Sequence, residues 1–293
     1  MISRMRRAVV VLAAAAGVVA VPAGAPAASL KASSTNWAGY AARRVGVDFQ
    51  RISGAWTVPA VDCSSTTGPT YSANWVGLGG YAIGAQALEQ LGTESDCSAV
   101  GRATYSAWFE VVPDVASTAK LRIKPGDRIF ASVTVAPLSR RVTMTLADRT
   151  RGTKATKTVS AGAVDLSSAE WIVEAPSLCF GSTQGSCSQT ELAKFGATGF
   201  TQARATTTSG HTGGLLDAAW NAVALTLTPK RVKGGHGTPS GPGSGPGGRG
   251  TWGPGGDDDP GAATQTATPQ RAGSARPGAL SADGSAFAVT YAG

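Results

Sequence analysis

The chain has almost no histidine. Only His211 and His236 occur among its 293 residues, and His236 lies in a stretch rich in glycine and proline. A Ser-His-Asp triad needs a histidine as general base, so it would have to use His211, in TSGHTGG, where a plain loop residue is the better interpretation. The sequence also lacks a Gly-x-Ser-x-Gly elbow and a His-Glu-x-x-His pair. Carboxylates must therefore do the chemistry of any enzyme here.

Cysteine is sparse, and its pattern argues against a bound metal. The four cysteines form no Cys-x-x-Cys pair accompanied by histidines, so zinc ligation is disfavoured. The run Asp257-Asp258-Asp259 lacks the spaced ligands of a calcium loop. We therefore expect neither a metal nor a cofactor. An even cysteine count in an exported protein predicts two disulfides. Three connectivities are possible, and Cys63 with Cys97 and Cys179 with Cys187 close the shortest loops.

Long apolar runs are missing beyond the N-terminus. Residues 1–27 combine an arginine-rich start, an apolar run and small residues before the end, which is the build of a secretory signal peptide. No later segment reaches the roughly 20 apolar residues that a membrane span requires. We expect a secreted, extracellular protein that has no membrane partner once the signal is removed.

Amphipathic helices are also missing, since no 3.6-residue stripe persists over ten residues. Short alternating runs separated by Gly, Pro, Ser and Asp predict strands instead. Their number and spacing favour an all-β fold with one core, a sandwich or a barrel, over residues 28–230. Residues 231–278 have too few apolar side chains to repay ordering and are predicted to be a disordered Gly/Pro-rich insertion. Alternation returns in 279–293, which predicts a final strand completing the sandwich.

The positive charge does not indicate a nucleic-acid partner. The formal net charge is +8, but three arginines leave with the signal peptide, and the 231–278 region with Lys230 carries a further excess. No cluster of Lys and Arg with interleaved aromatic residues remains. We expect a monomer that binds no nucleic acid.

Two strands place carboxylates beside tryptophans. A period of two puts Trp108 and Glu110 on one face of YSAWFEVVP, opposite Phe109. In AEWIVEA it puts Glu170 and Glu174 on the face opposite Trp171 and Val173. Solvated glutamates on ordinary strands are the plainest interpretation. Two others are a glycoside hydrolase using Glu110 and Glu174, and a non-catalytic glycan- or wall-binding module with exposed Trp37, Trp75 and Trp108.

Several ordered motifs resemble the glutamic peptidases, or eqolisins, and more closely their bacterial members. These motifs are STNWAGY, GAWTVP, ANWVGLGG, ALEQLGTE, YSAWFEVVPD, IKPGDRI, AEWIVEAPSLC and AFAVTYA. The resemblance implies a concanavalin-like or jelly-roll-type sandwich of two antiparallel sheets, with a substrate groove on one concave face. It also implies endopeptidase activity on polypeptide substrates, in acid and insensitive to pepstatin.

The family's catalytic dyad matches Gln90 in LEQLG and Glu174 in AEWIVE, with Glu170 as an earlier, non-catalytic acid. By the same matching, substrate-binding positions fall on Trp37, Trp75, Trp108, Glu110 and Glu94.

The chemistry agrees with that assignment. Water attack on a peptide bond needs a base for the proton and a donor for the oxyanion. A carboxylate such as Glu174 can take the proton, and the Gln90 amide can donate and accept without titrating. Carboxyl groups ionise near pH 4.3, so an acidic optimum is expected. Glu89 and Gln90 are adjacent, so only one can face the groove. The motif selects Gln90, with Leu88 on its side.

Overall fold

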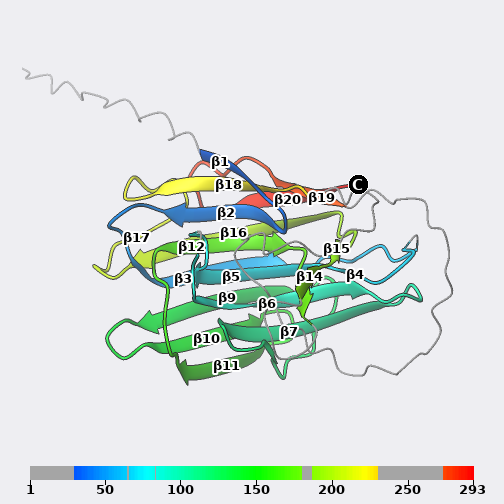
Figure 1. The fold of residues 1–293 in the computed structure, drawn as a ribbon, viewed down its shortest axis with the longest axis horizontal. Coiled ribbons are helices and arrows are strands. Elements are labelled where there is room, and N and C mark those ends of the chain that lie inside the picture. The colour runs from blue at the N-terminus through cyan, green and yellow to red at the C-terminus, as the bar shows by residue number, and fades with distance from the viewer. Residues whose placement is uncertain (1–29, 65, 83, 180–186, 230–272) are drawn as a thin grey trace, which may run out of the picture.

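The structure is a computed structural model, and it describes residues 30–64, 66–82, 84–179, 187–229 and 273–293. Within these ranges every regular element is a β-strand. The strands run side by side, with β1 and β18 near one edge of the molecule and β10 and β11 at the other (Figure 1). No helix in the described part of the chain is long and apolar enough to cross a membrane. The predicted signal peptide lies outside the described residues.

Eight strands form the first layer, and backbone pairing sets their order. From one edge to the other they are β1 (Leu30–Ser34), β18 (Asn221–Leu227), β2 (Trp37–Arg43), β12 (Ser168–Glu174), β5 (Ala73–Gly79), β6 (Leu88–Cys97), β7 (Ala103–Val112) and β8 (Ser117–Thr118). All these pairings are antiparallel except that of β1 with β18, which is parallel. Strands far apart in the sequence therefore become neighbours at the centre of this layer.

Seven strands form the second layer. In spatial order they are β19 (Ser274–Pro277), β20 (Phe287–Ala292), β16 (Ala197–Thr207), β3 (Phe49–Thr57), β9 (Arg128–Ala136), β10 (Arg141–Asp148) and β11 (Thr153–Ser160). The layers are joined at one edge, where Leu227 of β18 pairs with Ala275 of β19. The remaining strands are short: β4 (Thr70–Tyr71), β15 (Glu191–Leu192), β17 (Thr212–Gly213), and the ribbon of β13 (Ser177–Cys179) and β14 (Cys187–Gln189).

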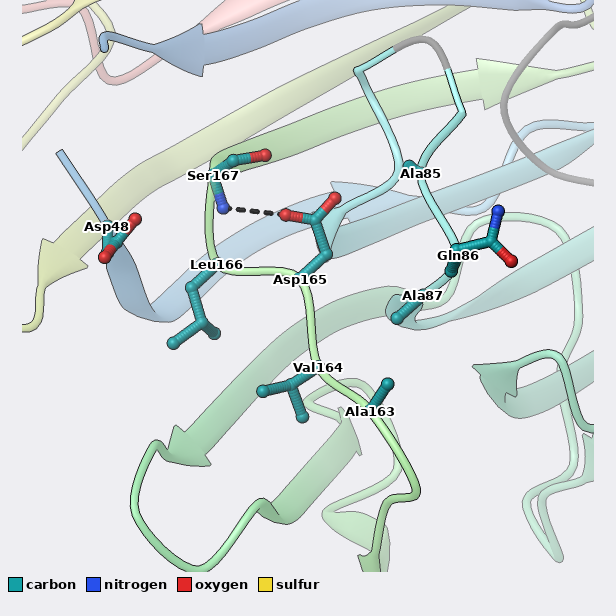
Figure 2. Close-up of a pocket in the computed structure, with 9 residues that line it drawn as sticks. All are labelled: Asp48, Ala85, Gln86, Ala87, Ala163, Val164, Asp165, Leu166 and Ser167. Atoms are coloured by element: carbon teal, nitrogen blue, oxygen red, sulfur yellow. Dashed lines mark hydrogen bonds between the residues drawn. The ribbon is translucent and has the colours of Figure 1, made fainter. Parts of the chain in front are cut away.

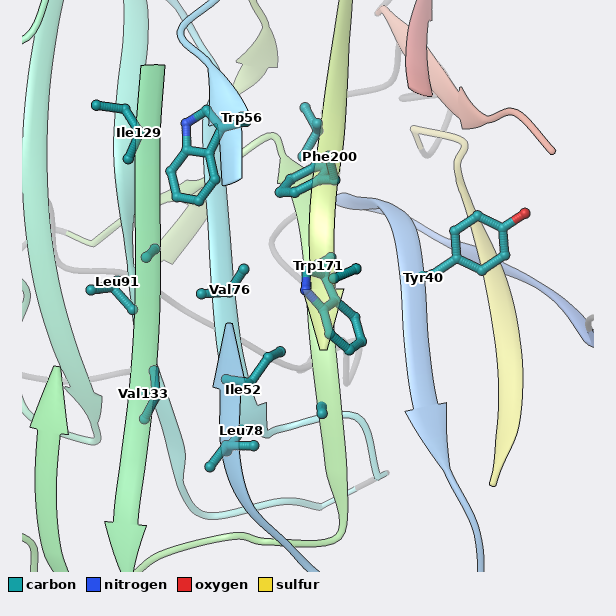
Figure 3. Packing of buried hydrophobic residues seen from close by; sticks show 14 of the residues in the cluster. Tyr40, Ile52, Trp56, Val76, Leu78, Leu91, Ile129, Val133, Trp171 and Phe200 are labelled. Carbon is teal, nitrogen blue, oxygen red and sulfur yellow. The ribbon is translucent and has the colours of Figure 1, made fainter. Parts of the chain in front are cut away.

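The main core fills the space between the layers. Ile52 and Val133 of the second layer and Val76 and Trp171 of the first are fully buried in it (Figure 3). Alternation produces this face, because every second residue of a strand points inward. The first layer is unusual in that β12 and β5 are buried on both faces along their whole length. Its second face therefore carries a cluster of its own, which holds the candidate site.

The predicted all-β sandwich is confirmed, but its last part differs from the prediction. Residues 231–272 of the predicted insertion lie outside the described residues. Ser274–Pro277, inside the predicted range, forms β19 and pairs with β20 and β18. The strand has only four residues, one of them proline, so composition concealed it. Phe287–Ala292 forms the expected final strand.

One of the two predicted disulfides is present among the described side chains. Cys63 is bonded to Cys97 across 34 residues, which ties the loop after β3 to the end of β6. In the small ribbon, Cys179 lies opposite Cys187 in the backbone register. Their side chains lie outside the described residues, so that second bond remains a prediction.

Removing the Cys63–Cys97 bond should destabilise the fold. Loop-closure entropy for a separation of 34 residues corresponds to about 4 kcal/mol, or roughly 10 °C in Tm for a domain of this size. A Cys63→Ala/Cys97→Ala variant compared with wild type by calorimetry measures it. An unchanged Tm would show that the loop is held by its other contacts.

Candidate active site

The candidate site lies on the tryptophan face, which we define as the side of the first layer that carries Trp37, Trp75 and Trp108. These side chains form a buried cluster with Ile172 and Leu88. The expected alternation is confirmed, because Trp171 and Val173 belong to the core on the opposite side of the layer.

Cross-strand pairing aligns four residues in one row of this face. Glu170 of β12 pairs with Gly77 of β5, Gly77 with Gln90 of β6, and Gln90 with Glu110 of β7. Directly paired residues point to the same side of a sheet, so Glu170, Gln90 and Glu110 share the tryptophan face. Gly77 leaves room beside Gln90, since a Cβ built there would lie 3.0 Å from the Gln90 Cβ.

A second row, four residues further along the strands, carries Glu174. It pairs with Trp37 on one side and Ala73 on the other, and Ala73 pairs with Glu94. Glu94 accepts a hydrogen bond from the Ser106 hydroxyl at 3.1 Å. The structure therefore brings all the predicted site residues to one face, in two rows that flank the middle row of Trp75 and Trp108.

The Glu174 carboxylate is held by two donors. The Trp75 indole N–H donates to Oε2 at 2.7 Å, and the Asn36 amide donates to Oε1 at 3.3 Å. The Ser34 hydroxyl donates to Asn36 Oδ1 at 3.1 Å, which fixes the orientation of that amide. Hydrogen bonds to a carboxylate favour its ionised form. Sequence reasoning missed Asn36, although it lies inside STNWAGY, because strand parity says nothing about residues between strands.

Removing the indole donor should weaken catalysis. A hydrogen bond to a charged group contributes about 1.5–3 kcal/mol, so Trp75→Phe should lower kcat/KM roughly 10- to 100-fold. The acid limb of the pH profile should also move to higher pH, because a donor that favours the ionised carboxyl is lost. Trp56→Phe is the control, since Trp56 donates to Thr93 in the core; it should lower Tm without moving the limb. An unmoved limb in Trp75→Phe would contradict the role assigned to Trp75.

Gln90 is oriented by its neighbour in the same row. Its amide Nε2 donates to Glu110 Oε2. Its carbonyl Oε1 is buried and has no hydrogen-bond partner among the described residues. An amide nitrogen carries two N–H groups, so one N–H and the carbonyl oxygen are available to a water and a substrate.

The expected orientation of the Glu89–Gln90 pair is confirmed. Glu89 points to the other side of β6, where its Oε1 accepts a bond from the Asp165 backbone N–H at 3.4 Å. Burial raises the pKa of Glu89 to about 9. Burial also raises the pKa of Glu170 well above its usual range, with Asp165 and Glu89 adding to the rise and the Ser168 hydroxyl opposing it. Glu89 is therefore protonated at neutral pH, and burial shifts Glu170 in the same direction.

Backbone groups hold the Asp165 side chain in place. Its carboxylate accepts from the Ser167 N–H at 2.9 Å and from the Gly80 N–H at 3.0 Å. It lines a cavity of about 490 Å³ together with Asp48 and Gln86 (Figure 2). The acid is thus a structural anchor for the segment that leads into β12.

The two members of the expected dyad lie on one face, in rows separated by the row of Trp75. Gln90 and Glu174 are two strands and four residues apart in register, which is roughly 17 Å between Cα atoms on a flat sheet. Trp75 lies between them, because β5 separates β12 from β6 and the row of Trp75 separates the rows of Gln90 and Glu174.

Comparison with known proteins shows the family of this chain. The profile of the Peptidase A4 family matches residues 35–232. This chain belongs to the peptidase A4 family. Aspergillopepsin-2 of Aspergillus niger is 31% identical over 206 residues, which is 63% of this chain and 68% of the relative.

Solved structures of glutamic peptidases agree with the family match. Scytalido-glutamic peptidase with a transition state analog inhibitor has a TM-score of 0.53 at 30% identity, covering 61% of this chain and 82% of that one. SCP-B, an eqolisin in complex with the tripeptide Ala-Ile-His, has a TM-score of 0.50 at 28% identity, covering 63% and 84%. The A4 chain is thus a glutamic endopeptidase, as the motifs implied. Its closeness to bacterial members remains a prediction.

Two expectations about the A4 peptidase's tryptophan face are wrong. Trp37, Trp75 and Trp108 are at most 3% exposed, so they are not free platforms for stacking sugar rings. Glu110 and Glu174 are at most 2% exposed, so they are not solvated glutamates. Period-two alternation places a residue on a face but does not reveal what packs there.

A retaining glycosidase mechanism does not fit the A4 peptidase either. Glu110 and Glu174 are three strands and four residues apart in register, or roughly 20 Å between Cα atoms on a flat sheet. Even with both side chains extended toward each other, the carboxyl groups remain about 10 Å apart. Retaining enzymes place them about 5–5.5 Å apart.

Proposed function

We propose that this A4 peptidase is a secreted endopeptidase that hydrolyses polypeptides in acid, with Glu174 and Gln90 as its catalytic dyad. One observation carries the proposal. A buried carboxyl with two hydrogen-bond donors lies on the same face as a buried glutamine whose carbonyl has no partner among the described residues. Such a pair has one member that can take a proton and one that can bind oxygen atoms without titrating.

The reaction follows from these roles. The Glu174 carboxylate takes a proton from water as the water oxygen bonds to the peptide carbonyl carbon. The oxyanion that forms accepts the free N–H of Gln90, while Gln90 Oε1 accepts from the attacking water. Glu174 then gives its proton to the amide nitrogen, and the C–N bond breaks. Glu110 keeps the Gln90 amide in one orientation through the bond to Nε2.

Acidic action and export have separate support. An enzyme that acts in acid must keep its base ionised and its fold stable at low pH. The raised pKa values of Glu89 and Glu170 make the folded state more stable at low pH than at neutral pH. The predicted signal peptide directs export. The Cys63–Cys97 bond is typical of oxidising compartments.

An assay of the mature protein tests the proposal. Purified protein is incubated with a denatured protein substrate from pH 2 to pH 7, with and without pepstatin, and new amino termini are identified by mass spectrometry. We expect internal cleavage that is greatest in acid and unaffected by pepstatin. Cleavage that peaks at neutral pH, release of terminal residues only, or inhibition by pepstatin would contradict it.

A further inference from the structure

The tryptophan face ends in an arginine. Alternation along β2 puts Arg43 on the same side as Trp37, and Arg43 pairs with Ser168 of β12. Ser168 in turn lies two residues before Glu170, on the row next to that of Gln90. The catalytic face therefore continues past Gln90 to a cation at the end of β2.

An aromatic ring holds the Arg43 guanidinium, which has no ionic partner in the described part of the chain. It lies over the Tyr81 ring, 5.0 Å from the ring centroid, and Tyr81 packs against the tryptophan cluster. Arg43 makes no salt bridge among the described residues. Stacking on an aromatic ring fixes the plane of a guanidinium and leaves its N–H edge for a bidentate acceptor.

The same arginine lines a cavity of about 170 Å³, whose other charged groups are Arg44 and Asp48. Arg44 already donates to the backbone carbonyls of Ala218 and Ala219. Ser168, which also lines the cavity, is 1% exposed. Its hydroxyl is near enough to the Glu170 carboxyl to lower the pKa of that group, but it meets hydrogen-bond geometry with no described residue. The cavity thus combines a net positive charge with a buried hydroxyl and a free guanidinium edge.

We propose that this cavity is a substrate subsite for a carboxylate, bound by Arg43 with Ser168 as a second donor. Resting on the proposed peptidase function, the subsite takes either an acidic side chain or the C-terminal carboxylate of a peptide. Arginine and a hydroxyl together match the planar, acceptor-only carboxylate group. The larger cavity beside it shares Asp48 and Ser167. That cavity is a poorer carboxylate site, because it presents Asp165, an acid already bonded to backbone N–H groups.

The register sets the distance from the scissile bond. Arg43 lies six residues beyond Trp37, the partner of Glu174, or about 20 Å along the strand. From Gln90 it is three strands and two residues away, or roughly 16 Å. An extended peptide advances about 3.3–3.6 Å per residue. The carboxylate should therefore sit about five residues from the bond that is cut, on one side only.

A substitution walk tests the subsite. A long peptide cleaved at a single site is made with Glu or Gln at each position on both sides, and kcat/KM is measured at a pH where the peptide carboxyl is ionised. We expect one position, about five residues away, where Glu is preferred by about fivefold. Two further peptides end at that position, one with a C-terminal carboxylate and one with a C-terminal amide. A preference for the carboxylate form shows that the subsite binds a chain terminus as well as, or instead of, an acidic side chain. In Arg43→Gln the preference should fall to about one, whereas Arg51→Gln, on the other layer, should keep it.

Equilibrium binding separates this proposal from the catalytic one. The Glu174→Gln variant binds the same fluorescent Glu and Gln peptides, followed by anisotropy, so selectivity is read without turnover. The proposal is overturned if neither assay shows a preferred position, or if Arg43→Gln leaves the preference intact. Selective binding without cleavage by the wild type would instead contradict the proposed function alone.

Discussion

Replacing Glu174 with glutamine is expected to lower kcat/KM on a peptide substrate by roughly 10³-fold or more. The amide cannot take a proton from water, so attack loses its base. It keeps the size of the side chain, and one of its atoms can still accept from Trp75 or Asn36. Gln90→Ala removes the oxyanion donor and the water acceptor together, and we expect a loss of roughly 10²- to 10³-fold.

Both variants must remain folded for this result to count, because both side chains are buried. Tm and circular dichroism at the assay pH provide that check. Glu191→Gln is the matched control and should keep full activity, because Glu191 lies on β15 near Tyr291 and outside the tryptophan cluster. Cleavage that survives Glu174→Gln or Gln90→Ala at near wild-type rates would rule out the dyad.

The second large effect is a loss of stability between acid and neutral pH. Glu89 has a folded-state pKa of about 9 because of its burial, against about 4.3 when unfolded. The folded protein therefore binds more protons than the unfolded chain throughout that window. Since stability falls with pH wherever the folded state holds more protons, the contribution is complete below about pH 4 and is lost as pH rises toward 9.

The size of the effect is several kcal/mol, on the order of 6 for Glu89 as an upper value. Glu170 acts in the same direction, since its pKa is also raised by burial. Asp283 affects stability in a different pH range. Hydrogen bonds from Ser285 and Ser281 lower its pKa to about 2, so its contribution is lost only in strong acid.

Urea unfolding at pH 4, 6 and 8 measures this dependence. Wild type should lose stability steadily across the series, whereas Glu89→Gln and Glu170→Gln should each show a shallower decline, because a neutral amide does not titrate. Glu191→Gln should decline as wild type does. A wild-type stability that is flat or rises with pH, or an unchanged slope in both variants, would contradict the assignment.

Local pattern was enough to sort the neighbouring acids and amides. Glu89 and Gln90 point to opposite sides of β6, and Glu170 and Glu174 to the same side of β12, as a period of two requires. The absence of histidine constellations directed attention to carboxylates. These inferences succeed because alternation is a property of each strand by itself.

Other features escaped the sequence because they depend on what packs against a strand. Asn36 orients the Glu174 carboxylate from a strand boundary 138 residues away. The tryptophans resembled exposed platforms but lie buried in a cluster. The four residues of β19 were assigned to a disordered insertion, yet they pair with β20.

The sequence by itself determined the class of fold and the face on which each strand residue lies, because composition and alternation are encoded within each segment. The pair of residues to test came from the resemblance of its motifs to the glutamic peptidases. Only the tertiary structure decided that β2, β12, β5 and β6 are neighbours, which donors hold Glu174, and that Glu89 and Glu170 are buried. It also decided that Arg43 extends the same face. Neighbours, burial and therefore pKa values arise from pairing between distant segments, which no local pattern specifies.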